Sequence, residues 1–201
     1  MEWLEFENQG YADGFESICG IDEAGRGPLA GGVFAAAVIL PKGMMIEGVN
    51  DSKKLSEKKR EMLFDVICEQ ALDYAVGIAT EQEIDEINIL NATFLAMHRA
   101  YEGLEKQADL ALIDGNQKPH LPIAQRMIVK GDARSMSIAA ASILAKVSRD
   151  RYMLEMDRMY PEYQFARHKG YGTKLHYEMI EKYGVSPIHR KTFLKKILNH
   201  G

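Results

Sequence analysis

The sequence is poor in cysteine and has no long apolar run. Two cysteines, Cys19 and Cys68, lie within apolar segments and lack the spacing of a metal site. A disulfide framework is therefore not expected, and a reducing compartment suits the chain. The longest unbroken apolar run, from Val33 to Leu40, ends at Pro41 and is far too short to span a bilayer.

Several targeting and binding patterns are also missing. Acidic residues occupy positions 2, 5 and 7, so the start lacks the basic-then-apolar pattern of a signal peptide, and we expect a cytoplasmic protein. The chain has no G-x-x-x-x-G-K-[ST] loop and no G-x-G-x-x-G spacing, which argues against nucleotide-binding folds of these kinds. Its six histidines show no zinc-ligand spacing. Nothing indicates a partner chain, so we expect a monomer.

What the chain does contain is an ordinary globular composition with an uneven charge. Its 201 residues, 46% of them apolar, suffice for a large core, and we expect a single domain over 1–201 in which residues from about 160 to 201 form a C-terminal helical extension. The net charge is −4, yet residues 146–201 carry 12 Lys and Arg against 6 Asp and Glu. This basic quarter is either a region that contacts phosphates or a solvated surface.

Hydrophobic periodicity and capping residues predict an α/β chain. Strands are expected over 17–22, 32–40, 72–79, 109–114 and 126–130. Helices are expected from Ser56 to about 70, from a capping box at Thr80, over about 89–105, from Ser135 to about 159, and near 174–182 and 190–198. This order favours a mixed β-sheet flanked by helices, with a small C-terminal helical lobe.

Acidic residues stand beside glycines where predicted strands end. Asp22 and Glu23 open the stretch DEAGRGPLAGG, Asp114 lies in IDGN, and Asp132 lies in KGDARS. Strand ends that are distant in sequence meet at one edge of a sheet, where gathered carboxylates repel one another. A divalent cation removes that repulsion, and oxygen-only ligands favour Mg²⁺ or Mn²⁺ over Zn²⁺. The four acids are therefore candidate metal ligands.

Each acid also has a simpler explanation. Asp132 could cap the following helix, Asp114 could belong to a turn, and Asp22 and Glu23 could form a salt-bridged loop pair. Neighbouring residues of a strand point to opposite faces, so Asp22 and Glu23 can share one site only if the backbone turns there, which the nearby glycines allow. The recurrence of acid, glycine and strand end at each place favours the metal site.

Two loops have the composition of a nucleic-acid contact. In DSKKLS, Ser52 and Lys53 offer a hydroxyl and a charge to a phosphate, although a solvated turn explains them equally well. In HKGYGTKLH, Tyr171 lies between two glycines and among lysines, which suits stacking on a base or a sugar. A turn with a core tyrosine is the alternative there.

These motifs, in this order, resemble the ribonuclease HII family. Arg26 between two glycines favours this type over the sister type 3 enzymes. Two departures, Gly32 for a usual proline and Thr192 for a usual serine, touch no expected catalytic position. The matching segments span nearly the whole chain: CGIDEAGRGPLAG (19–31), AAAVILP (35–41), DSKKLS (51–56), IDGN (113–116), KGDARSMSIAAASILAKVSRD (130–150), HKGYGT (168–173) and HRKTF (189–193).

The resemblance implies a ribonuclease H-like fold and an endonuclease. The implied reaction, with two Mn²⁺ or Mg²⁺ ions, cleaves the RNA strand of RNA/DNA hybrids and cuts 5′ to single ribonucleotides embedded in duplex DNA, leaving 3′-hydroxyl and 5′-phosphate ends. The resemblance assigns recognition of the 2′-hydroxyl to the Gly-Arg-Gly segment, and stacking on the neighbouring deoxyribose to Tyr171. The implied catalytic metal ligands are Asp22, Glu23, Asp114 and Asp132. The implied nucleic-acid contacts are Gly25, Arg26, Gly27, Ser52, Lys53, Asn116 and Tyr171.

Two alternatives stay open at this point. One is another nuclease of the same fold that acts on all-DNA substrates, and the other is a hybrid-binding module without catalysis. Four acids with no missing member weigh against the second alternative. The C-terminal LKKILNHG shows no sliding-clamp peptide, so clamp binding is not expected.

Overall fold

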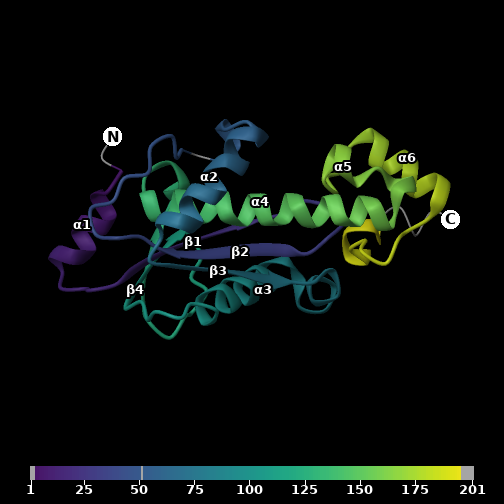
Figure 1. Cartoon of the computed structure of the whole chain (residues 1–201). Coiled ribbons are helices and arrows are strands. Elements are labelled where there is room, and N and C mark those ends of the chain that lie inside the picture. The colour runs from purple at the N-terminus through teal and green to yellow at the C-terminus, as the bar shows by residue number, and fades with distance from the viewer. Residues whose placement is uncertain (1–2, 51, 196–201) are drawn as a thin grey trace.

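A five-stranded mixed sheet forms the centre of the computed structural model, which describes residues 3–50 and 52–195 (Figure 1). The strand order is β3-β2-β1-β4-β5. β2 is antiparallel to β1 and β3, whereas β4 is parallel to β1 and β5. The mixed sheet expected from the sequence is confirmed. The strands are β1 (Ile18–Ala24), β2 (Val33–Ile39), β3 (Asp73–Ala79), β4 (Leu110–Asp114) and β5 (Ala124–Ile128).

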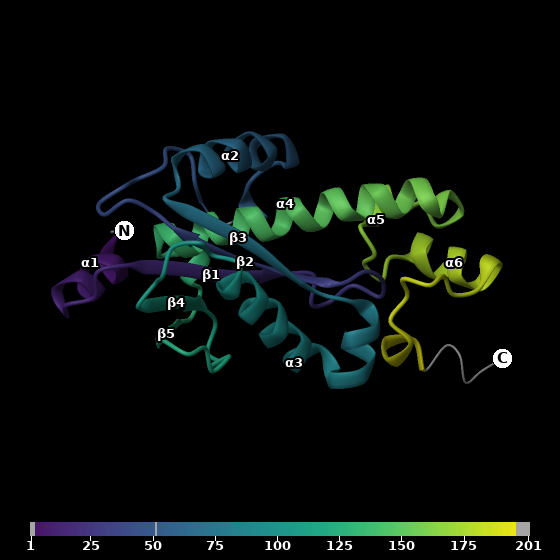
Figure 2. The same ribbon diagram turned by 60° about the horizontal axis from the view of Figure 1, so that its bottom comes forward.

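Helices cover both faces of this sheet. α4 (Met136–Met159) and α2 (Glu57–Gln70) lie on one face, and α3 (Glu81–Glu102) covers the other (Figures 1 and 2). β2 is buried at all seven positions, as a central strand between two helical layers must be. Its alternate residues explain this burial, because Ala35 and Ala37 belong to the core on the α3 side while Ala36 and Val38 belong to the core on the α4 side.

Gly20 allows β1 to approach α4 at backbone distance. A Cβ at this position would lie 2.1 Å from the carbonyl carbon of Ser137, well inside van der Waals contact. Only glycine fits between the strand and the first turn of the helix. The position of α4 is therefore fixed relative to the strand that carries Asp22.

Helix starts follow the caps read from the sequence. The Ser56 hydroxyl accepts a hydrogen bond from the Lys59 N–H at the start of α2, and Thr80 and Glu83 form a capping box at α3. The hydroxyl of Ser135 caps α4 by accepting from the Ile138 N–H. The alternative in which Asp132 caps this helix is therefore wrong.

Other elements differ from the prediction in detail. α3 spans both helices expected after Thr80, with a kink at Asn88 (φ 69°) where the second was expected to begin. Two helices were not predicted, α1 (Glu5–Ala12) and α5 (Phe165–His168), because both are too short to show a clear period. α6 (Lys174–Tyr183) lies where expected. The last predicted helix is a 3-10 helix over Lys191–Leu194, and its remainder, like most of LKKILNHG, lies outside the described residues.

The C-terminal helices lie beyond the sheet, next to the end of α4 (Figures 1 and 2). A single β-bridge between Ala30 and His189 connects this region to the loop that follows β1. Among the described residues, no helix has the length and apolar character needed to cross a membrane.

Candidate active site

Asp22 and Asp114 lie side by side on two neighbouring parallel strands, Asp114 at the end of β4 and Asp22 just after the last residue of β1 that pairs with β4. The residues directly before them, Ile21 of β1 and Ile113 of β4, pair in register. Asp132 belongs to a short 3-10 helix before α4, and its backbone N–H donates to Asp114 Oδ1 at 3.3 Å. The structure thus brings three acids from distant parts of the sequence to one edge of the sheet.

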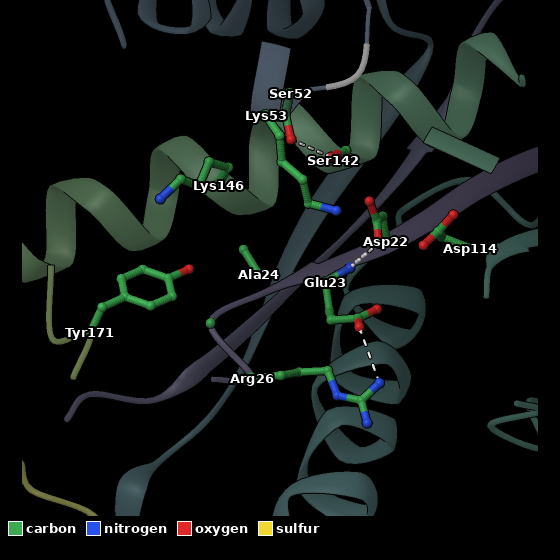
Figure 3. Close-up of a pocket in the computed structure, with 11 residues that line it drawn as sticks. Asp22, Glu23, Ala24, Arg26, Ser52, Lys53, Asp114, Ser142, Lys146 and Tyr171 are labelled. Atoms are coloured by element: carbon green, nitrogen blue, oxygen red, sulfur yellow. Dashed lines mark hydrogen bonds and ion pairs between the residues drawn. The ribbon is translucent and has the colours of Figure 1, made fainter. Parts of the chain in front are cut away.

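Glu23 follows Asp22 on β1 without a turn between them. The strand continues to Ala24, two residues further than predicted, so the expected turn is absent and the two side chains diverge (Figure 3). The Asp22 and Glu23 side chains nevertheless line one pocket together with Asp114. This is possible because β1 continues past Ile21, its last residue that pairs with β4. The Glu23 N–H donates to Asp22 Oδ1 at 2.7 Å, and Arg26 Nη1 lies 3.5 Å from Glu23 Oε1.

Burial and mutual repulsion both act on these carboxylates. Asp22 and Asp132 are only 5% and 6% exposed. Burial raises the pKa of Asp22 well above its ordinary value, and the charges of Glu23, Asp114 and Asp132 raise it further. Burial also raises the pKa of Glu23, although the guanidinium of Arg26 opposes this. The site therefore favours additional positive charge.

The donor chemistry of this edge suits a hard cation. Every acid gathered here offers carboxylate oxygens, the ligands preferred by Mg²⁺ and Mn²⁺. Lys53 Nζ lies 3.8 Å from Asp132 Oδ2 and its side chain extends toward Asp22 (Figure 3). Within residues 3–50 and 52–195, no three acidic, histidine or cysteine side chains already stand close enough together to hold an ion.

Ser52 is fixed against α4 at the rim of the same pocket. Its hydroxyl lies 2.8 Å from the hydroxyl of Ser142, and the residue is 4% exposed. Arg60 Nη1 donates to the carbonyls of Ser52 and Leu55 at 3.0 and 2.6 Å. These bonds hold the Ser52–Lys53 segment in place, with both residues lining the pocket.

The glycines after β1 serve two different purposes. Gly25 has φ +92°, and a Cβ there would lie 2.1 Å from Arg149 Nε. At Gly27 the nearest heavy atom to an added Cβ would be Tyr171 Cε1, at 4.0 Å. Packing therefore requires glycine at position 25 but not at position 27, where an added Cβ would come no closer to the tyrosine ring than van der Waals distance.

Tyr171 stands at the pocket and is 42% exposed. Lys146 Nζ and Arg149 Cζ lie 5.8 and 5.6 Å from the centre of its ring. The alternative of a core tyrosine is therefore wrong, and the ring is flanked by cations instead. Asn116 lies beside the pocket, where it lines a second hollow with Glu23 and Arg26.

Some pocket residues were not identified from the sequence. Ser142 and Lys146 project from α4 into a cavity of about 240 Å³ (Figure 3). Arg149 packs against Gly25. These three residues recur at intervals of three and four, which is the spacing of one helix face. That signal was present, because the helix itself was predicted.

Solved structures share this fold. The ribonuclease H2 from Pyrococcus horikoshii OT3 matches with a TM-score of 0.74 and 28% identity, over 88% of this chain and 93% of that one. A Bst-RNase HIII in complex with Mn²⁺ matches with a TM-score of 0.67 and 20% identity, over 84% of this chain and 63% of that one. The fold and the carboxylate-lined pocket thus define a protein of the ribonuclease H class.

The sequence comparisons narrow this class. Residues 19–196 match the family described as Ribonuclease HII. The ribonuclease HII of Clostridioides difficile (strain 630) is 63% identical over 96% of this chain and 76% of its own length. The chain belongs to the ribonuclease HII family and is a ribonuclease H type endonuclease.

Proposed function

We propose that the chain cleaves the RNA strand of RNA/DNA hybrids and cuts 5′ to single ribonucleotides embedded in duplex DNA, leaving 3′-hydroxyl and 5′-phosphate ends. The observation that supports this is one shared pocket, in which a carboxylate cluster lies beside a glycine loop and an exposed tyrosine. In such a pocket the scissile phosphate and its ribose would bind next to each other. The residues concerned are Asp22, Glu23, Asp114, Gly25, Arg26 and Tyr171.

We propose that two divalent ions, Mn²⁺ or Mg²⁺, bind at this edge. Asp22, Glu23, Asp114 and Asp132 would hold them, since positive charge there relieves the repulsion that raises the pKa of Asp22. Bound ions supply Lewis acidity and lower the pKa of a coordinated water. The contact of Lys53 with Asp132 would be exchanged for one with the substrate.

Ribose recognition is proposed for the glycine loop. The peptide groups of Gly25, Arg26 and Gly27 would bind the 2′-hydroxyl, which both donates and accepts hydrogen bonds. The bare backbone of Gly27 faces the Tyr171 ring, so a sugar bound beside the loop would lie close to both. Tyr171 would then stack on the neighbouring deoxyribose, with its flanking cations directed at the backbone.

Phosphate binding is proposed for three other places around the pocket. Ser52 and Lys53 would contact one phosphate through a hydroxyl and a charge, because both line the cavity. Lys146 reaches the same cavity from α4 and would add a second cation. Asn116 would contact the strand from the neighbouring hollow.

A panel of three duplexes tests this proposal. One carries a single ribonucleotide, one is an RNA/DNA hybrid and one is all DNA, each incubated with and without Mn²⁺ or Mg²⁺. We expect cleavage of the first two only, and only with metal. Cleavage of the all-DNA duplex would favour a DNA nuclease of the same fold. Binding of the first two duplexes without cleavage, even when metal is present, would favour a hybrid-binding module.

A further inference from the structure

A buried dipeptide in the segment HRKTF contacts both elements proposed to recognise the ribose. His189 and Arg190 are 2% and 0% exposed. Their backbone lies against the loop that follows β1, since the Arg190 N–H donates to Leu29 O at 2.8 Å and the Gly31 N–H donates to Ile188 O at 2.8 Å. The two adjacent side chains then extend to different targets.

Arg190 binds the glycine loop through its guanidinium. Nη2 donates to Gly25 O at 2.6 Å, Nη1 donates to Arg26 O at 2.9 Å, and Nε donates to Gly31 O at 2.8 Å. Burial lowers its pKa to about 9, and the charge of Arg149 acts in the same direction. In the described part of the chain no carboxylate forms an ion pair with Arg190, so the loop carbonyls solvate its charge and are held in place by it.

His189 belongs to a row of imidazoles that leads to Tyr171. His176 Nδ1 lies 2.9 Å from Tyr171 O, and His176 Nε2 lies 2.9 Å from His189 Nε2. A carbonyl only accepts, so His176 Nδ1 carries the proton and His176 Nε2 accepts from His189 Nε2. His189 Nδ1 is then an acceptor, which agrees with the Ser186 N–H facing it at 2.8 Å.

His168 holds the same tyrosine from its other side. The Tyr171 N–H donates to His168 O at 2.9 Å, and the His168 ring stacks on His176 with centres 4.2 Å apart. His168 Nε2 lies 2.9 Å from Tyr163 O and therefore donates, while its Nδ1 accepts from Gly170 N at 3.2 Å. In this histidine cluster, defined as His168, His176 and His189, each imidazole nitrogen has one defined role and all three rings are neutral.

We infer that His189 and Arg190 are positioning residues that set the distance between the Gly25–Gly27 loop and Tyr171, and so the selectivity of the enzyme for a ribose. This inference rests on the proposed function. Two adjacent residues share one stretch of backbone, so a displacement of the loop is transmitted to the tyrosine. Neither residue touches the reacting atoms. Arg190 acts through loop carbonyls and His189 acts through His176.

Two substitutions at one position separate positioning from stability. His189→Gln keeps an N–H donor at the place of Nε2, whereas His189→Asn keeps an acceptor for Ser186 but has no donor that reaches His176. We expect kcat/KM on the single-ribonucleotide duplex to stay within about threefold of wild type in His189→Gln and to fall about tenfold in His189→Asn, as for one lost hydrogen bond. The Kd for all-DNA duplex should change by less than about twofold in both.

Arg190→Lys and a control in the same region complete the experiment. The lysine keeps the charge but not the guanidinium fork, so we expect a loss of about tenfold or more in kcat/KM on the same duplex. Tyr163→Phe keeps the ring, whose centre lies 5.2 Å from that of His189, and the backbone carbonyl that faces His168, and removes only a hydroxyl that donates to Gly184 O at 2.9 Å. This control should lower Tm without changing kcat/KM.

The outcomes distinguish a failure of this inference from a failure of the proposed function on which it rests. Equal losses in His189→Gln and His189→Asn at equal Tm would overturn the positioning role, and so would wild-type kinetics in His189→Asn or Arg190→Lys. If the wild-type protein itself does not distinguish the single-ribonucleotide duplex from all-DNA duplex, the proposed function fails instead.

Discussion

The carboxylate edge of the sheet and the histidine cluster bury ionisable groups in opposite ways. In the cluster each ring nitrogen meets a partner of the complementary kind, so three imidazoles are accommodated without charge. At the edge, carboxylates neighbour carboxylates, and burial and repulsion raise the pKa of Asp22. The comparison shows that the cluster is satisfied by the fold alone, whereas the charges of the edge oppose one another, a repulsion that bound cations would relieve. Two predictions test this contrast, and a third tests the glycine loop beside the edge.

Asp22→Asn should have the largest effect. We expect kcat/KM on the single-ribonucleotide duplex to fall by at least about 10³-fold, because the variant loses a proposed metal ligand. The free energy of unfolding should rise at pH 7, because the raised pKa of Asp22 means that the fold disfavours its charged form. Each kcal/mol recovered raises Tm by roughly 2–4 °C. Cleavage assays measure the loss of activity, and thermal unfolding in the absence of divalent ions measures the gain in stability.

Asp65→Asn is a suitable control for this variant, because Asp65 is an exposed carboxylate on α2. It should change neither kcat/KM nor Tm. Wild-type cleavage by Asp22→Asn would remove this residue from the mechanism. A Tm of Asp22→Asn below that of wild type would show that the carboxylate edge is not under electrostatic repulsion.

A decrease in pH should change the stability contributed by the two regions in opposite directions. Burial lowers the pKa of His176 and His189 to about 4, below the 6.5 of the unfolded state. The unfolded chain binds more protons between these values, so stability is lost as pH falls from about 6.5 toward 4. The raised pKa of Asp22 works in reverse, because the folded chain binds the extra proton and gains stability as pH falls through it.

Urea unfolding at pH 7 and pH 5 measures this difference. The two imidazoles should cost on the order of 2–4 kcal/mol of stability between these pH values. The Asp22→Asn variant lacks one of the carboxylates that compensate for this loss, so it should lose more stability than wild type. Glu83 lies outside this range, because its hydrogen bond with Arg99 lowers its pKa to about 2. An unfolding free energy of the variant that does not change between the two pH values would contradict a neutral histidine cluster.

Gly27→Ala should have the smallest effect and the most selective one. A methyl group has room in the free protein, with its nearest neighbour at 4.0 Å, so Tm should stay within about 2 °C of wild type. It would occupy space proposed for the ribose, and we expect kcat/KM on the single-ribonucleotide duplex to fall about tenfold.

Gly25→Ala is the matched comparison. Its φ of +92° and the overlap with Arg149 should lower Tm clearly. Thermal unfolding and cleavage of both variants, measured together, separate the two glycines. Wild-type cleavage by Gly27→Ala would show that the space facing Tyr171 is not used.

Features that depend on residues close together in the chain can be predicted from the sequence alone. Ser56, Thr80 and Ser135 cap helices because their hydroxyls reach the next turn, and this pattern is local. Asp22 and Asp114 meet because each directly follows the last pair of apolar residues, Ile21 and Ile113, that joins β1 to β4, and the apolar runs before the two acids predict this meeting although β1 itself continues past Asp22.

Other features depend on parts of the chain that sequence periodicity does not relate. β1 continues through Glu23 because β2 pairs with it as far as Ala24, and no local signal marks that partner. The role of Arg190 depends on Gly31, which is 159 positions earlier in the chain. The segment HRKTF was recognised as a motif, but its contacts come only from the folded arrangement.

The packing at Gly20 has a consequence for anyone who redesigns this enzyme. The residue lies outside the cavity, yet any side chain there would push α4 off the sheet, since a Cβ would lie 2.1 Å from the backbone of Ser137. The helix would carry Ser142 and Lys146 with it, so the two walls of the cavity would separate while every residue lining it stayed the same. Gly20 therefore controls the width of the cavity although it does not line it. A choice of mutable positions based only on their distance from the carboxylates would wrongly include Gly20.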